Sequence, residues 1–368
     1  MFIQKIDKQT LLKPLQIVNG IVERKQTMPI LSNVLIEAKQ GGLHFTASDM
    51  EIQISTSVTL DDHVLPDAAI TLGGKKLQDI LRILPEQSSI SIDLAESKAL
   101  VKANKSRFSL QTLPAEDFPL LPNQTTQGHK ITLSQGQLKT LLHSVQYAMA
   151  QQDVRYYLNG LLLVVDGNQL KAIATDGHRL AYNATTLASE HEKQDIIVPR
   201  KTILELYKLL NENEEIVSIE FSEQQIRFVF SDTTLISKVI DGRFPDYQRV
   251  IPKYHNQLPL NRLQLQQALQ RVAILSNEKF RGVRLVLTEN NLSVISSNSE
   301  QEEAQEDIDT HYDGNALDIG FNVNYLMDGL NNMSGENTIF SFGDMNSSVL
   351  LTSVEQENFR YVVMPMRL

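Results

Sequence analysis

The sequence contains no cysteine among its 368 residues. It can therefore form no disulfide, no thiolate zinc site and no thiol nucleophile, and this absence fits a reducing cytoplasm. It also lacks any run of about 18 apolar residues, so we expect no membrane-spanning segment and no membrane partner. Residues 1–7 carry charges where a secretory signal would be apolar. Together these absences predict a cytoplasmic protein.

Sequence signatures of common enzymes are missing as well. There is no Gly-x-Ser-x-Gly nucleophile elbow and no Gly-x-x-x-x-Gly-Lys-Ser/Thr phosphate loop, and Gly73-Gly74-Lys75-Lys76 is too short to replace the latter. The eight histidines are dispersed, with no pair of histidines at i, i+4. We therefore expect no metal site, no cofactor and no catalytic residues.

The stretch Ala174-Thr175-Asp176-Gly177-His178-Arg179-Leu180-Ala181 is open to two interpretations. An acid and an imidazole beside a glycine are typical of a catalytic turn, so one alternative is a DNA-modifying or hydrolytic enzyme that uses His178. The other is a docking surface, because His178 has no nucleophile to serve. Asp176 has counterparts at Asp49 and Asn298, which favours an architectural role, and Gly177 permits a turn that a side chain would block.

A threefold internal repeat is the strongest positive signal. An apolar i, i+4, i+7 triad, which marks one face of a helix, recurs at intervals of 127 residues: Leu11, Leu15 and Val18; Leu138, Leu142 and Val145; Leu265, Leu269 and Val272. Each triad is followed by two strands around a Gly- or Asn-containing turn, then by a second helix (77–84, 202–210 and 323–333) and further strands. The pattern predicts three α+β domains with boundaries at 1–127, 128–256 and 257–368.

The charge is distributed unevenly between these repeats. The net charge is −10, but basic and acidic residues nearly balance over 1–127 (13 and 14) and 128–256 (14 and 15), whereas 257–368 holds 7 and 15. The first repeat carries the basic run Lys98, Lys102, Lys105 and Arg107, and the third carries an acidic run over 300–307. Most such runs are solvated faces, but opposite signs in the terminal repeats favour a head-to-tail contact that closes after two subunits.

Six stretches spread over the whole chain resemble one known family. They are Leu31-Ser32-Asn33, residues 152–160, 174–181, Asp241-Gly242-Arg243-Phe244-Pro245-Asp246-Tyr247, residues 274–284, and Tyr361-Val362-Val363-Met364-Pro365-Met366-Arg367-Leu368. They are similar to the beta sliding clamps of bacterial DNA polymerase III, the processivity factors of DNA replication. The resemblance implies three DNA-clamp domains, each with two helices packed on antiparallel sheets. It further implies a homodimeric ring that encircles duplex DNA and tethers the polymerase without doing chemistry.

The same resemblance assigns a dimer interface to the terminal repeats. The positions that match interface positions of the family are Lys76, Lys98, Lys105, Arg107, Phe108 and Leu110 in the first repeat, and Ile274, Leu275, Glu300, Glu303 and Glu306 in the third. We expect Phe108 and Leu110 to meet Ile274 and Leu275 at an apolar centre. Lys76 would face Glu300, and Lys105 would face Glu306, as rim pairs that set the register.

A sliding ring must hold phosphates loosely and ignore base edges, which requires scattered basic residues and no recognition helix. By family position, the expected contacts with double-stranded DNA are Arg24, Lys25, Lys75, Gln152, Tyr156 and Tyr157. Lys25 and Lys75 occupy positions that are commonly arginine in the family, so they would act as point charges. An alternative for Tyr156 and Tyr157 is that they are half-buried aromatics of a strand. We expect the protein to bind DNA without preference for a particular base sequence.

The C-terminus is unusually apolar for a chain end, and a final strand would account for its valines but not for its methionines. The resemblance implies a peptide-binding pocket here, for motifs of the kind Gln-x-x-Leu/Met-x-Phe. Its expected residues are Leu158, Thr175, Gly177, His178, Arg179, Leu180, Pro245, Arg249, Val250, Phe280, Asn322, Tyr325, Ser348, Val362, Val363, Met364, Pro365, Met366, Arg367 and Leu368. The implied partners are the catalytic subunit of DNA polymerase III, the clamp loader, other DNA polymerases and mismatch-repair proteins.

Overall fold

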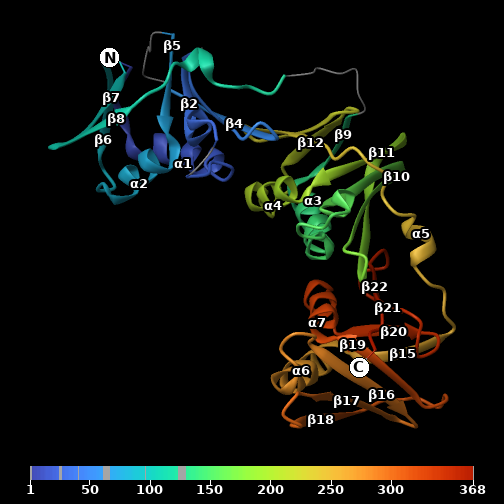
Figure 1. Ribbon diagram of the computed structural model, residues 1–368. Coiled ribbons are helices and arrows are strands. Elements are labelled where there is room, and N and C mark those ends of the chain that lie inside the picture. Colours follow the sequence, from blue (N-terminus) through green and yellow to red (C-terminus); the bar gives the residue numbers. More distant parts are fainter. Residues whose placement is uncertain are drawn as a thin grey trace. The chain divides into compact units, whose positions relative to one another are not determined.

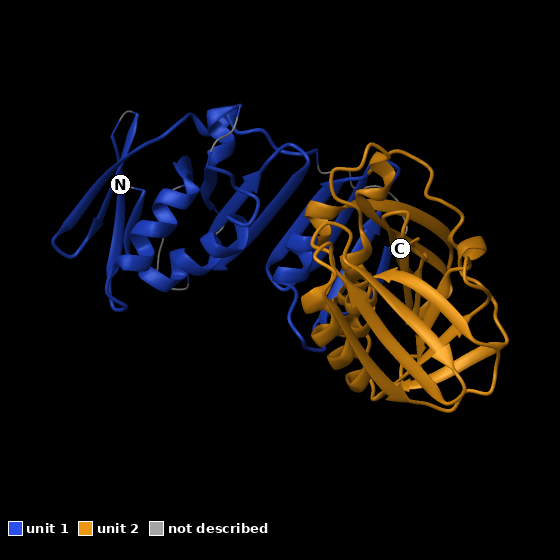
Figure 2. Ribbon diagram, turned by 60° about the horizontal axis from the view of Figure 1, so that its bottom comes forward, with its two compact units in different colours: residues 1–136, 204–239 blue, residues 137–203, 240–368 orange. Residues whose placement is uncertain are grey.

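The computed structural model describes residues 2–24, 27–39, 41–60, 67–95, 97–122 and 130–367 (Figure 1). The chain divides into two compact units (Figure 2). One comprises Met1–Gly136 and Leu204–Val239, and the other comprises Gln137–Ile203 and Ile240–Leu368. Within the described ranges, no helix is both long and apolar enough to cross a bilayer.

The first unit contains two antiparallel sheets. The smaller has the order β1 (Ile3–Asp7), β6 (Ser89–Ala95), β7 (Lys98–Ala103) and β8 (Ser106–Gln111). The larger has the order β5 (Ala68–Gly73), β2 (Asn33–Lys39), β3 (Gly42–Ser48), β4 (Ile52–Thr59), β14 (Thr233–Lys238), β13 (Gln225–Phe230), β12 (Ile216–Phe221) and β9 (Lys130–Ser134). Because β4 pairs with β14, strands of the first and second repeats form one continuous sheet.

Two helices of the first repeat, α1 (Lys8–Val18) and α2 (Gly74–Ile83), contact each other in this unit. The Asp7 carboxylate caps α1 by accepting a hydrogen bond of 2.7 Å from the Gln9 amide. The Asn19 side chain follows α1 and donates to the Gly74 carbonyl of α2 at 3.1 Å. A Cβ atom at Gly74 would lie 2.2 Å from Asn19 Oδ1, so this helix contact requires glycine.

The second unit also contains two antiparallel sheets. The first has the order β10 (Gly160–Thr175), β11 (Arg179–Pro199), β22 (Arg360–Val363), β21 (Val349–Ser353), β20 (Asn337–Phe342) and β15 (Asn256–Asn261). The second has the order β18 (Glu303–Asp309), β17 (Asn291–Ser297), β16 (Gly282–Thr288) and β19 (Leu317–Asn322). The pairing of β11 with β22 brings strands of the second and third repeats into one sheet.

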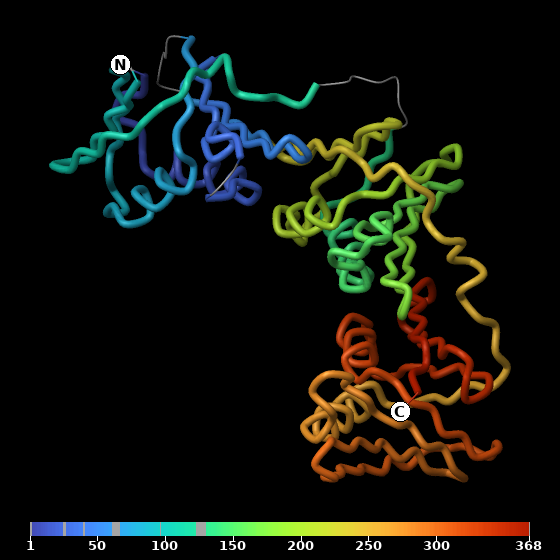
Figure 3. The backbone as a smooth tube through the Cα atoms, viewed as in Figure 1, coloured from blue at the N-terminus to red at the C-terminus, as the bar shows by residue number. Residues whose placement is uncertain are grey.

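The remaining α-helices are α3 (Gln135–His143), α4 (Arg200–Leu209), α5 (Tyr247–Val250), α6 (Arg262–Val272) and α7 (Val323–Asn332). Short 3-10 turns cover Pro29–Ser32, Ala115–Asp117, Gln146–Ala148, Tyr156–Leu158 and Ala273–Leu275. Figure 3 follows the backbone through the three repeats in sequence order.

The predicted helical triads form the cores of the repeats. All nine apolar side chains are buried, none more than 2% exposed, and each repeat supplies at least two helices and antiparallel strands, so the predicted α+β class is confirmed. The turn expected at 166–168 lies inside β10, where Gly167 has a φ of +60° and the register with β11 shifts. The expected domain boundary at 256/257 falls after Asn256, the first residue of β15, and stays a prediction. The expected boundary at 127/128 lies outside the described residues.

Candidate functional site

The turn that joins β10 to β11 is held by its own side chains. The Asp176 carboxylate accepts hydrogen bonds from the amides of His178 (2.9 Å) and Arg179 (3.1 Å), and the Thr175 hydroxyl donates to the Arg179 carbonyl at 2.6 Å. Gly177 has a φ of +91°, which disfavours a side chain at this position. Asp49 and Asn298 cap the corresponding turns by accepting two backbone hydrogen bonds each. The architectural role expected for Asp176 is therefore confirmed.

Arg155 braces this turn from the neighbouring loop. Its guanidinium donates to both carboxylate oxygens of Asp153, at 3.0 and 2.8 Å, and to the Asp176 carbonyl at 3.1 Å. These hydrogen bonds lower the pKa of Asp153 to about 2. A Cβ atom at Gly177 would lie only 2.9 Å from Arg155 Nη1, so the close approach of this brace also depends on glycine. The residue pattern alone did not identify Arg155 as part of the site.

Arg179 lies behind the turn and connects the second repeat to the third. Its side chain is only 10% exposed, and it donates to the Asp176 carboxylate at 3.0 Å, to the Tyr147 carbonyl at 2.8 Å and to the Asp328 carboxylate of α7. Its guanidinium carbon lies 4.6 Å from the ring centroid of Tyr325. Because these donors are used within the fold, we assign Arg179 a structural role, and its expected contact with a peptide stays a prediction.

Tyr361 and Tyr325 both lie beside this buried arginine. Burial raises the pKa of Tyr361, which keeps its hydroxyl protonated, and that hydroxyl donates to the Tyr325 carbonyl at 2.9 Å. The half-buried Tyr325 ring stacks on the exposed His178 ring, with centroids 6.4 Å apart and planes inclined by 19°. His178 is therefore positioned as an exposed aromatic surface.

The C-terminal segment is anchored on both sides of Pro365. The Met364 amide donates to the His178 carbonyl at 2.9 Å, and the Met366 amide donates to the Gly320 carbonyl of β19 at 2.8 Å. Met364 remains 45% exposed. The C-terminal segment thus runs beside the exposed aromatic surface of His178. Leu368 lies outside the described residues.

The expected pocket residues divide into a buried layer and an accessible layer, all in the second unit. Leu158, Thr175, Leu180, Val362 and Val363 are buried. Leu180 and Val362 belong to one apolar cluster, on which the partly buried Phe244, Tyr247 and Ile251 pack. The accessible or partly accessible residues are Gly177, His178, Arg179, Pro245, Arg249, Val250, Phe280, Asn322, Tyr325, Ser348, Met364, Pro365, Met366 and Arg367. The buried residues are thus placed to support the accessible ones.

The residues expected to contact DNA occupy different environments. In the first unit, Arg24 is highly exposed, whereas the Lys75 amine donates to the Asn19 carbonyl at 2.7 Å and its pKa is lowered by burial. In the second unit, Gln152 is exposed with a φ of +56°, and Tyr156 is 59% exposed. Tyr157 instead packs against the apolar cluster. Lys25 lies outside the described residues.

Several of the residues expected at the dimer interface lie on the strands β8 and β18. Among the described residues, β8 and β18 each pair with one neighbour only. On β8 the half-buried Phe108 and Leu110 alternate with exposed residues, and Ile274 of the second unit is 78% exposed. Lys76, Lys98, Lys105, Arg107, Glu300 and Glu303 are exposed and Leu275 is half-buried, whereas Glu306 accepts a fork of hydrogen bonds from Arg271 of its own chain.

Family models of the DNA polymerase III beta subunit match nearly the whole chain. The N-terminal domain model matches residues 1–122, the central domain model 132–246 and the C-terminal domain model 248–367. The chain is 47% identical over 368 residues to the beta sliding clamp of Pseudomonas putida, with 99% of both chains covered. It is 42% identical over 364 residues to that of Escherichia coli K12, again with 99% of both covered.

Solved structures of sliding clamps are also similar. A sliding clamp from Pseudomonas aeruginosa bound to griselimycin matches with a TM-score of 0.94 and 44% identity, covering 99% of each chain. A beta sliding clamp from Caulobacter crescentus with bound polyethylene glycol matches with a TM-score of 0.93 and 35% identity, covering 99% of this chain and 98% of that one.

Proposed function

The chain belongs to the DNA polymerase III beta subunit family, the beta sliding clamps, and we propose which of its surfaces close the ring, contact DNA and bind partner proteins. The protein is a DNA sliding clamp, a non-catalytic processivity subunit that works as a ring on DNA with a polymerase. The alternative of an enzyme built on His178 has no support. The His178 amide donates a structural hydrogen bond to Asp176, and the His178 ring stacks on Tyr325.

We propose that the ring closes by pairing β8 of one subunit with β18 of the other. Both are edge strands among the described residues, and edges with unpaired backbone groups are suited to strand addition. Phe108 and Leu110 would meet Ile274 and Leu275 at the centre of this contact. The Arg271–Glu306 pair within one chain leaves Glu300 and Glu303 as the better partners for the basic first repeat.

We propose that DNA is held through the exposed members of the expected set. Arg24, Gln152 and Tyr156 are exposed, and the contact of 3.9 Å between Arg24 and Asp79 lies in solvent, so all three can reach a phosphate or an unpaired base. Lys75 is tied to the end of α1, so it would contribute its charge from a fixed position. Contact between Lys25 and DNA stays a prediction. Such sparse contacts fit DNA binding without sequence specificity. We expect this binding to take place in the cytoplasm, where the bacterial chromosome is replicated.

We propose that the surface between the His178–Tyr325 stack and the Met364–Met366 segment docks extended peptides. The observation that supports this most directly is the pair of backbone hydrogen bonds that hold Met364 and Met366 in place. An aromatic wall and a methionine wall over the buried Leu180 and Val362 fit the anchors of a Gln-x-x-Leu/Met-x-Phe motif. The catalytic subunit, the clamp loader, other DNA polymerases and mismatch-repair proteins would compete for this surface.

The docking surface is tested with a fluorescent peptide that carries such a motif. Deletion of residues 364–368 removes one wall, and we expect it to weaken binding at least tenfold, about 1.4 kcal/mol. Val354→Ser is a matched control, because Val354 is 63% exposed in the same unit but outside the proposed surface. Unchanged affinity after the deletion would refute the dock.

A further inference from the structure

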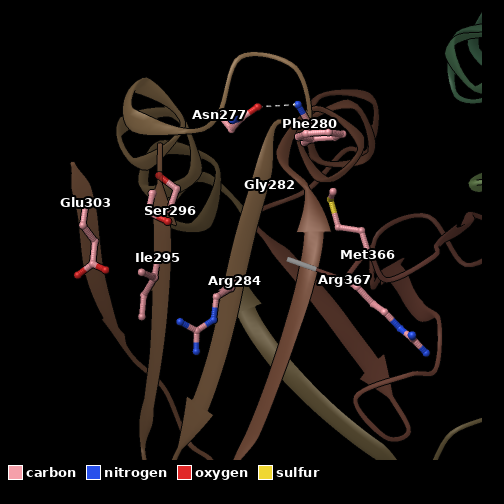
Figure 4. Close-up of a pocket in the computed structure, with 10 residues that line it drawn as sticks. Asn277, Phe280, Gly282, Arg284, Ile295, Ser296, Glu303, Met366 and Arg367 are labelled. Atoms are coloured by element: carbon pink, nitrogen blue, oxygen red, sulfur yellow. Dashed lines mark hydrogen bonds between the residues drawn. The ribbon is translucent and has the colours of Figure 1, made fainter. Parts of the chain in front are cut away.

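A groove lies next to the proposed docking surface, on the face of the β16–β17 sheet. Its volume is about 390 Å³, and it is lined by Asn277, Phe280, Gly282, Arg284, Ile295, Ser296, Ser297, Glu303, Met366 and Arg367 (Figure 4). Phe280, Met366 and Arg367 belong to both surfaces. The remaining lining residues extend the groove across the sheet toward Glu303 on β18.

The upper wall of this groove is preformed. Asn277 Oδ1 accepts hydrogen bonds from the amides of Lys279 (3.0 Å) and Phe280 (3.1 Å), and the Asn322 side chain donates to the Phe280 carbonyl at 3.3 Å. These bonds hold the backbone of Phe280 while its ring stays 55% exposed. An incoming peptide would therefore meet an ordered aromatic wall.

The floor combines apolar and cationic groups. Ile295 lies directly opposite Arg284 in the pairing of β16 with β17, and Gly282 leaves one end of the floor without a side chain. The Arg284 guanidinium forks onto the Asp318 carboxylate through Nε and Nη2. Among the hydrogen bonds of the described residues, Nη1 of Arg284 has no acceptor, so it can donate to a further carboxylate or carbonyl.

Local charge indicates what the groove would accept. Residues 257–368 hold only seven basic residues against fifteen acidic ones, yet Arg284 and Arg367 line this groove, and Lys279 and Arg281 flank its Phe280. Among the described residues, Glu303 is the single acidic residue that lines the groove. Four of the seven basic residues of an otherwise acidic repeat thus line the groove or flank Phe280, which favours an acidic ligand.

We propose that this groove is an extension subsite for the segment that flanks the docking motif of a partner peptide. The segment carries an apolar residue that rests between Ile295 on one side and Phe280 and Met366 on the other, and an acidic residue that pairs with Arg284. The proposal rests on the proposed docking function, because continuity through Phe280, Met366 and Arg367 leads the peptide into the groove. Such a subsite would make the affinity of a partner depend on the residues that flank its docking motif.

The test compares one fluorescent motif peptide with versions extended at either end by Leu-Asp-Asp. Extensions of Leu-Lys-Lys and Ser-Gly-Ser at the same ends serve as controls. We expect Leu-Asp-Asp at one end to tighten binding to the full-length protein about tenfold, with a smaller gain at high salt. The lysine extension should give no gain.

Two groove variants, Arg284→Gln and Ile295→Ser, identify where the gain arises. Both positions are outside the proposed motif site, so the unextended peptide should bind each variant as it binds the parent. The gain from Leu-Asp-Asp should disappear in both. A gain at neither end, or one that survives both substitutions, would overturn the extension subsite. If the unextended peptide itself fails to bind the parent protein, the docking function has failed instead.

Discussion

Arg179 offers the sharpest test of how the docking surface is supported. Its side chain is 10% exposed, and its carboxylate partners Asp176 and Asp328 are 16% and 40% exposed. Removing one member of a buried ion pair costs ~3–5 kcal/mol, because the other charge is left unpaired. Asp328 is partly solvated, so we place Arg179→Met at the lower end, about 3 kcal/mol.

This loss is measured as the free energy of unfolding in urea and as the midpoint of thermal unfolding. For a unit of about 200 residues, ~3 kcal/mol corresponds to a fall of roughly 6–12 °C. Arg179→Lys keeps the charge but not the planar fork, so it should recover only part of the loss. Arg249→Met is the control: Arg249 is 87% exposed in its pair with Asp246, and its replacement should cost at most ~1 kcal/mol.

A double-mutant cycle with Asp328→Asn separates the ion pair from general packing. Because Arg179 and Asp328 are in contact, the double variant should be more stable than the sum of the two single losses predicts, by at least ~1 kcal/mol. Two results would contradict the assigned role. One is an Arg179→Met protein within ~1 kcal/mol of the parent, and the other is strict additivity in the cycle.

Two further predictions concern the ring and the brace of the turn. Replacing Ile274 and Leu275 by alanine should give a folded monomer, and sedimentation of the double variant as an intact dimer would exclude them from the interface. Arg155 holds the pKa of Asp153 at about 2 instead of 3.8, so this pair stabilises the fold above about pH 4, and the stabilisation is lost as the pH falls through about 2. In Arg155→Gln, a carboxyl NMR titration should return the Asp153 midpoint toward 3.8; an unchanged midpoint would contradict the pairing.

Features that depend on neighbouring residues could be predicted well. The helical triads form the cores because a spacing of three or four residues places side chains on one face of a helix. The role of Asp176 followed from its counterparts Asp49 and Asn298, because an Asx cap acts on amides two to four residues away. Such short-range geometry is largely independent of the rest of the fold.

Features that depend on distant partners could not be predicted in the same way. The list of expected pocket residues did not distinguish the buried Leu180 and Val362 from the exposed His178, because exposure is set by what packs on each strand. Asp328 was not identified at all. It lies 149 residues from Arg179, and a carboxylate on an amphipathic helix normally faces solvent.

The sequence by itself determined the three repeats, their helices, the turn chemistry at Asp176 and, through its resemblance to the sliding clamps, the function. The tertiary structure decided how repeats share sheets through the β4–β14 and β11–β22 pairs, and how Arg179 is held between Asp176 and Asp328. It also decided where Met364 and Met366 are anchored. The physical reason is one of range: periodicity and capping act within a few residues, whereas strand pairing and burial of charge join residues more than a hundred positions apart.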